Sequence, residues 1–164
     1  MLYEKAQKEV FAAIMSGERV AGGMDGKGGF IVTPDGYKAF IFPLSIVAFN
    51  LDKVANFDKF KEYLDDVKPE NEIRLLPFTR DDSLGRSRQR IRMLDNHGSI
   101  VYADERFFAY WQAPKFYQAS GKPLEKIIVT EKTGSIENPV GFFLPMRCEF
   151  KETINIKEVE TDEG

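Results

Sequence analysis

Apolar side chains recur with a helical period at the start of the chain. Glu4, Lys5, Lys8 and Glu9 fall mostly on other faces, and Ser16-Gly17 can end the helix. The pattern predicts an amphipathic helix over about the first fifteen residues. The positions that share its apolar face are Leu2, Ala6, Val10, Ala13 and Ile14.

Shorter apolar runs bounded by turn residues predict strands further along the chain. The strands are expected at 30–33, 37–42, 72–78, 89–94, 99–103, 127–130 and 140–146. Two more helices are expected at 57–67 and 104–112, and the glycine-rich stretch 22–29 predicts a flexible turn or loop. The pattern indicates an α+β fold with helices packed on mainly antiparallel sheets. The residues expected to form its core are Phe40, Phe42, Phe107, Trp111, Phe142 and Leu144.

Two passages about a hundred residues apart repeat one another. Each has an apolar-Val-Thr strand, a turn that contains glycine, and an aromatic strand that ends in proline; the first spans 30–43 and the second 128–145. This spacing is too long for a solenoid, whose repeats run about 20–50 residues. Either two short hairpins share a composition by chance, or a helix-and-hairpin unit is duplicated about a pseudo-twofold axis.

The segment from Ile100 to Phe108 and the segment from Val140 to Arg147 carry a resemblance to a known family. The first resembles the strand and helix that open one half of a bacterial DNA sliding clamp domain, and the second resembles the strand near the clamp's end. The resemblance implies two similar halves with helices on one side of curved sheets. A clamp subunit has three such domains, whereas this chain has room for one, so neither a ring nor the clamp's partner-binding pocket is carried over.

Length and terminal composition place one domain in this chain. We expect a single α+β domain over residues 1–150, followed by an acidic tail over 151–164 in a chain of 164 residues. The first residues lack the pattern of a signal peptide, and no apolar run approaches the ~18 residues of a membrane span. We therefore expect a cytoplasmic protein with no membrane contact.

Motifs for familiar chemistry are missing from the sequence. Cys148 is the single cysteine and His97 the single histidine, so a disulfide within the chain and a multi-cysteine metal site are excluded. The glycine-rich stretch departs from a phosphate-binding loop because Ala21 and Gly28 stand where glycine and Ser or Thr are required. We assign no catalytic residue, no metal ligand and no cofactor, and we lean away from an enzyme.

An arginine-rich segment is the strongest candidate for binding. Alternate positions of an extended strand share one face, so such a ribbon can contact the phosphates of a nucleic acid. The alternative is a solvated face that pairs with nearby acids such as Asp81 and Asp82, and a sequence pI of about 5.4 argues against a dedicated nucleic-acid binder. The candidate polyanion contacts are Arg80, Arg86, Arg88, Arg90 and Arg92.

Aromatic residues gather between 107 and 117. We expect Phe107, Phe108 and Trp111 in the core, whereas Tyr110, Phe116 and Tyr117 are candidates to rim a groove for a peptide or a base. Three functions stay open. The preferred one is a non-enzymatic binding or assembly module with a protein partner or a second copy. The others are a nucleic-acid-associated protein and an enzyme of unrecognised type.

Overall fold

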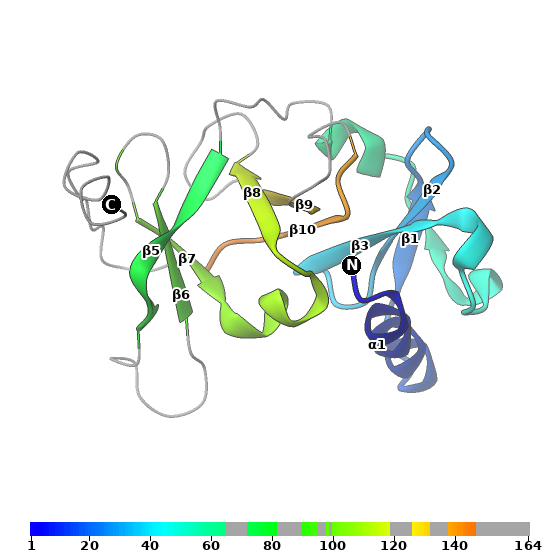
Figure 1. Ribbon diagram of the computed structural model, residues 1–164. Coiled ribbons are helices and arrows are strands. Elements are labelled where there is room, and N and C mark those ends of the chain that lie inside the picture. The colour runs from blue at the N-terminus through cyan, green and yellow to red at the C-terminus, as the bar shows by residue number, and fades with distance from the viewer. Residues whose placement is uncertain are drawn as a thin grey trace.

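The structure, a computed structural model, describes residues 1–64, 72–81, 90–94, 98, 100–118, 126–131 and 138–146. Its longest helix is α1 (Tyr3–Met15), and the other helices are short 3-10 turns (Figure 1). The strands are β1 (Ala21–Met24), β2 (Gly29–Thr33), β3 (Lys38–Pro43), β4 (Ala55–Asn56), β5 (Glu72–Asp81), β6 (Arg90–Leu94), β7 (Ile100–Asp104), β8 (Pro114–Gln118), β9 (Ile127–Glu131) and β10 (Gly141–Phe143). The 3-10 helices are η1 (Leu44–Ile46), η2 (Leu51–Lys53), η3 (Phe60–Tyr63) and η5 (Glu105–Tyr110).

Within the described residues ten strands form one sheet, and together with α1 and the short helices this confirms the predicted α+β class. Their order is β4-β1-β2-β3-β10-β9-β8-β5-β6-β7, and every pairing is antiparallel except that of β1 with β4. The two hairpins predicted from the repeated pattern lie side by side, because β3 pairs with β10 and places Phe40 opposite Gly141.

One part of the sheet curls back on itself. The long strand β5 pairs with β8 through its first two residues and with β6 through Arg74, Leu75, Arg80 and Asp81, with a shift of register between Leu75 and Arg80. Three residues after β10, the backbone N–H of Met146 donates to the carbonyl of Tyr102 in β7 over 2.7 Å. Pairings from β10 through β9, β8, β5, β6 and β7 therefore return to the chain that follows β10, beside η5 (Figure 1).

Helix α1 packs on the larger of two apolar clusters through small side chains. Ala6, Val10 and Ala13 are buried there, as the helical period predicts, and they lie in one cluster with Phe40 and Phe42. Helix η5 contributes Phe107 and Tyr110 to the same cluster, so both helices cover one side of the sheet. The other side carries a smaller cluster formed by Ile31, Ala39, Ile41, Phe60, Tyr117, Ile128 and Phe142.

Close packing explains the glycine in β10. A Cβ atom at Gly141 would lie 2.5 Å from the carbonyl oxygen of Ala39 and 2.7 Å from Cζ2 of Trp111. Both distances are shorter than van der Waals contact, so only glycine lets the Trp111 ring lie against this strand.

Several sequence predictions need correction. Five of the six predicted core residues are buried, but Leu144 is 41% exposed because β10 ends at Phe143. The helix predicted at 57–67 is wrong within the described residues: Ala55–Asn56 pairs with β1, and only a 3-10 turn follows, at Phe60–Tyr63. Strand β1 overlaps the stretch predicted as a flexible loop, and strand β8, which begins at Pro114, lies where no strand was expected.

In the part of the chain that the structure describes, each helix is too short or too polar to cross a membrane.

Candidate functional site

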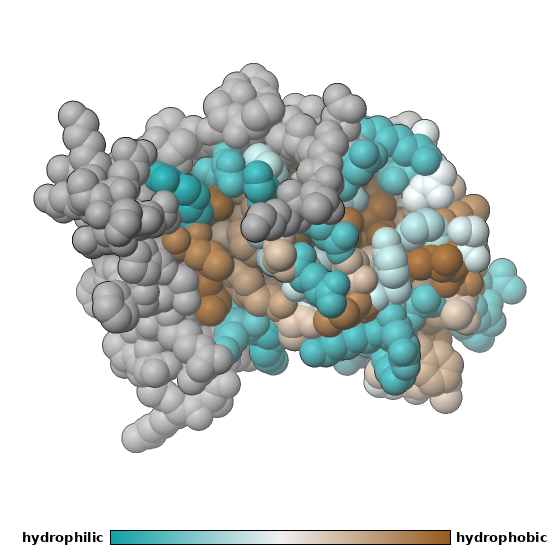
Figure 2. All heavy atoms as spheres, viewed as in Figure 1, coloured by the Kyte–Doolittle hydropathy of each residue, from teal (hydrophilic) through white to brown (hydrophobic). Residues whose placement is uncertain are grey.

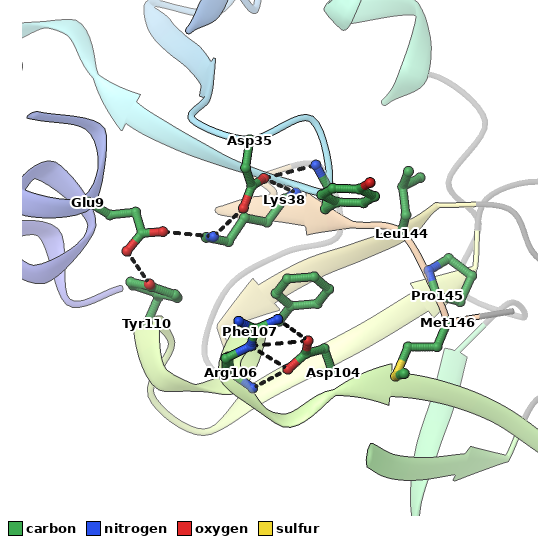
Figure 3. A pocket seen from close by; sticks show the side chains of 11 residues that line it. Glu9, Asp35, Lys38, Asp104, Arg106, Phe107, Tyr110, Leu144, Pro145 and Met146 are labelled. Atoms are coloured by element: carbon green, nitrogen blue, oxygen red, sulfur yellow. Dashed lines mark hydrogen bonds and ion pairs between the residues drawn. The ribbon is translucent and has the colours of Figure 1, made fainter. Parts of the chain in front are cut away.

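A pocket of about 790 Å³ opens between α1, the β2–β3 turn, η5 and the chain that follows β10 (Figure 3). Its lining combines three carboxylates, two cations, two tyrosines and a group of apolar side chains. The lining residues are Glu9, Asp35, Tyr37, Lys38, Asp104, Arg106, Phe107, Tyr110, Leu144, Pro145 and Met146.

The β2–β3 turn fixes Asp35 at the pocket wall. Gly36 has a φ of +78°, which glycine adopts without strain, and its N–H donates to Thr33 Oγ1 over 2.8 Å. Asp35 Oδ1 accepts the backbone N–H groups of Tyr37 and Lys38 at 2.9 and 3.1 Å. These bonds leave Asp35 Oδ2 to face the side chain of Lys38, three residues further on.

The ammonium group of Lys38 joins three separate parts of the chain. Its Nζ lies 2.6 Å from Asp35 Oδ2 and 2.9 Å from Glu9 Oε1, and Tyr110 donates its hydroxyl proton to Glu9 Oε2 over 2.7 Å. The same Nζ lies 5.8 Å from the ring centroids of Phe107 and Tyr110, within cation–π range. We call Glu9, Asp35, Lys38 and Tyr110 the lysine cluster.

In the lysine cluster, the pKa values of Glu9, Lys38 and Tyr110 are all shifted further from pH 7. Burial opposes the charge on Lys38, but the hydrogen bonds to Asp35 and Glu9 outweigh it and raise the pKa of Lys38. Burial also opposes the charge on Glu9, yet the bonds from Lys38 and Tyr110 lower its pKa. Burial, and then the bond to Glu9, raise the pKa of Tyr110. Near pH 7, Lys38 is therefore an ammonium, Glu9 is a carboxylate and Tyr110 is a neutral phenol.

A second charged pair lies across the pocket. Asp104 accepts the backbone N–H of Arg106 at 3.0 Å and so caps η5. The Arg106 guanidinium also donates to Asp104, with Nε 3.0 Å from Oδ1 and Nη2 2.6 Å from Oδ2. This is the forked geometry that arginine forms with carboxylates. We call Asp104 and Arg106 the arginine pair.

The two charged groups present opposite signs to solvent. In the lysine cluster, the side chains of Glu9 and Asp35 are 36% and 30% exposed, while Lys38 beneath them is only 8% exposed. In the arginine pair the order is reversed, since Arg106 is 70% exposed and Asp104 is 8% exposed. Figure 3 shows Phe107 between the two groups, with Leu144, Pro145 and Met146 along one side.

The predicted arginine contacts are placed only in part. Arg80 is in β5, and Arg90 and Arg92 are in β6, where they alternate with the buried residues Ile91 and Met93. The register sets Arg90 opposite Asp104 and Arg92 opposite Tyr102, so β6 borders the strand that carries one wall of the pocket. Arg86, Arg88, His97, Cys148 and the acidic tail over 151–164 lie outside the described residues.

The predicted aromatic groove is not formed by its three residues. Phe116 and Tyr117 are neighbours in β8 and are buried in opposite clusters, because successive strand residues point to opposite faces of a sheet. Only Tyr110 lines the pocket, and it does so as part of the lysine cluster. The prediction failed because β8 was not recognised as a strand inside the sheet.

Sequence reasoning missed both charged groups. Two local signals existed: Asp35 is the central residue of a Pro-Asp-Gly turn that Lys38 follows by two residues, and Asp104 stands at a helix cap two residues before Arg106. No local signal links Glu9 with Tyr110, which lie 101 residues apart.

A second hollow, of about 410 Å³, lies between α1 and residues 46–49 and is mostly apolar. The Gln7 side chain fixes its far wall, because its amide donates to the carbonyl of Ile46 and accepts the N–H of Ala48. Figure 2 shows apolar residues (brown to tan) among polar ones (teal) at the surface over α1 and the chain that follows β3.

Across the residues that the structure describes, no group of three or more His, Cys, Asp or Glu side chains is arranged to hold a metal ion. Comparisons of this chain with protein-family models, with curated proteins and with solved structures found no match.

Proposed function

We propose that this protein is a non-enzymatic binding module whose pocket between the lysine cluster and the arginine pair receives a segment of a partner protein. The observation that carries the proposal is the internal pairing of the charges in this pocket. Lys38 is held between two carboxylates, and Arg106 forms a fork with Asp104.

Pairing of this kind does not favour catalysis by the described residues. A general acid or base works best with a pKa near the working pH, and a nucleophilic lysine needs a lowered pKa. Here the pKa of Glu9 is lowered and those of Lys38 and Tyr110 are raised, each away from neutrality. The same pairing fixes the shape of the pocket in advance, which reduces the entropy lost on binding.

Selection from a library of random displayed peptides tests the proposal. We expect the full-length protein to enrich peptides that bind about tenfold or more weakly to the double variant Tyr37→Ala, Arg106→Gln. Both changed side chains are exposed, so the fold is retained, which circular dichroism checks. The matched control is Lys8→Gln on α1, which should bind the same peptides normally. A selection in which no enriched peptide discriminates between the wild type and the pocket variant would overturn the proposal.

Nucleic-acid binding is a second candidate, favoured by the alternation of Arg90 and Arg92 with buried residues in β6. The pairing of β6 with β7 argues against this candidate, because it places the acidic residue Asp104 opposite Arg90. If three or four arginines contact duplex DNA, log K should fall against log salt with a slope of about −3, and Arg90→Ala with Arg92→Ala should flatten it by about 2. The full chain and a shortened chain ending at Phe150 should both be measured, because an acidic tail can compete with DNA for the same side chains. No binding by either at low salt would discard this candidate.

We also propose that the chain contains an internal duplication like that of a sliding-clamp domain. The proposal is supported by the order of the elements, since α1 precedes β1–β2–β3 and η5 precedes β8–β9–β10. The antiparallel contact of β3 with β10 is the one that a two-fold axis between the halves would produce. Superposing an experimental structure of residues 3–43 on residues 105–143, and each half on a clamp domain, tests it; halves that cannot be superposed would reject it.

A further inference from the structure

We infer that the pocket recognises a dipolar peptide segment, in which a basic and an acidic side chain stand on either side of an apolar one. This inference rests on the proposed function and names the kind of partner segment that the pocket takes. It follows from which member of each charged group faces solvent.

The lysine cluster presents its negative side to a ligand. Glu9 and Asp35 are about one-third exposed, whereas the ammonium of Lys38 lies beneath them, with the rings of Phe107 and Tyr110 within 5.8 Å. An approaching group therefore meets carboxylate oxygens before it meets the cation. A lysine or arginine side chain of the partner is the group that this surface attracts.

The arginine pair presents its positive side. Arg106 is 70% exposed and its partner Asp104 is 8% exposed, so the guanidinium covers the carboxylate. A planar guanidinium has five N–H donors, and two nitrogens, Nε and Nη2, are directed at Asp104. A carboxylate of the partner is the group that the outer side of this guanidinium fits.

The surface between the two groups is apolar. Phe107 lies between them, and Leu144, Pro145 and Met146 form one side of the pocket (Figure 3). A volume of about 790 Å³ is within the range of small-ligand sites, about 300–1,000 Å³, and is large for a single amino acid. An apolar side chain between a basic and an acidic one matches this sequence of surfaces.

The experiment uses short capped peptides that differ only in charge. The probes are blocked peptides with the central sequences Lys-Leu-Glu, Glu-Leu-Lys, Lys-Leu-Gln, Gln-Leu-Glu and Gln-Leu-Gln, titrated into full-length protein by NMR. We expect one of the two dipolar peptides to bind about tenfold more tightly than Gln-Leu-Gln, with the singly charged peptides between them. Equal affinity of the better dipolar peptide and a singly charged one would overturn the inference.

Two variants assign each charge of the peptide to its side of the pocket. Arg106→Gln should reduce the affinity for the dipolar peptide to that for Lys-Leu-Gln and leave Lys-Leu-Gln unaffected. Glu9→Gln, which keeps an oxygen to accept the Tyr110 bond, should weaken only peptides that carry lysine. Lys8→Gln should change neither. Equal effects of either pocket variant on all peptides would indicate a structural role and overturn the inference.

The library selection distinguishes a failure of this inference from a failure of the proposed function. Pocket-dependent peptides without the dipolar pattern, obtained from the library selection, would leave the binding module standing and reject the dipolar partner. A selection without any pocket-dependent peptide would reject both.

Discussion

The lysine cluster and the arginine pair use the same kinds of charged group in opposite ways. Lys38 is buried and joins α1, the β2–β3 turn and η5, with partners as far apart as Glu9 and Tyr110. Arg106 is exposed, and its partner Asp104 is two residues away in the same turn. Removing a buried charge that links distant segments leaves its partners uncompensated, so the fold depends on it, whereas an exposed charge held locally can meet a ligand. The comparison therefore separates the part of the pocket that maintains shape from the part that can respond to a partner.

The largest loss of stability is expected when the buried ammonium of Lys38 is removed. We expect Lys38→Met to lower the free energy of unfolding by about 3 kcal/mol, because it leaves Glu9 and Asp35 as neighbouring carboxylates without a cation. Urea denaturation at pH 7 measures the change. A loss below about 1 kcal/mol would mean that the lysine cluster behaves like an exposed ion pair.

A double-mutant cycle shows whether the cost arises from the stranded carboxylates. Glu9→Gln should cost less in the Lys38→Met background than in the wild type, because it then removes a repelling charge. Costs that simply add would contradict a coupled cluster.

Tyr110→Phe should have the next largest effect on stability. It removes the hydroxyl that donates to Glu9 Oε2 over 2.7 Å and keeps the buried ring. Hydrogen bonds to charged groups contribute about 1.5–3 kcal/mol, so we expect a loss near the lower end, since Glu9 is partly hydrated. Tyr37→Phe, at an exposed ring on the same pocket, is the matched control and should be almost neutral in the same denaturation assay.

Regular elements were predictable where one local pattern dominated. Ala6, Val10 and Ala13, which recur with the helical period, form the buried face of α1. The Pro-Asp-Gly turn lies between β2 and β3. Strand β8 was missed because it begins with a proline, Pro114, just after the helix expected at 104–112, although the strand pairs with β9 and β5. Leu144 was misplaced because the apolar run continues past the last residue of β10.

The pocket could not be predicted because its parts meet only through the sheet topology. Glu9 comes from the first helix, Lys38 from β3 and Met146 from the chain that follows β10. The contact between β3 and β10, which brings these segments together, joins strands about a hundred residues apart. Sequence spacing carries no information on such a pairing. The binding site was therefore predicted at the alternating arginines of β6 instead of at this pocket.

Acid should weaken the lysine cluster through Glu9. The pKa of Glu9 in the folded chain is below its usual value of 4.5, so its stabilising contribution is present above that value and is lost as the pH falls. We expect the difference in unfolding free energy between the wild type and Glu9→Gln to shrink below about pH 5. Urea denaturation across this range measures it. A difference that stays constant with pH would show that the Glu9 carboxylate gains nothing from Lys38.

The smallest effect on stability is expected at the arginine pair, and unlike that of the lysine cluster it should depend strongly on salt. Arg106→Met removes a guanidinium that is 70% exposed, and exposed ion pairs contribute about 0–1 kcal/mol. The Asp104 carboxylate loses the guanidinium but still caps η5, because methionine keeps the backbone N–H at position 106 that donates to it. Because exposed charges are screened over about 3 Å in 1 M salt, most of the small loss should disappear there, while the loss caused by Lys38→Met should largely remain. Parallel urea titrations of both variants at low and high salt give the answer. If the two losses responded equally to salt, burial would not be what distinguishes the lysine cluster from the arginine pair. Arg106 would then belong to the residues that stabilise the fold rather than to those that bind a ligand.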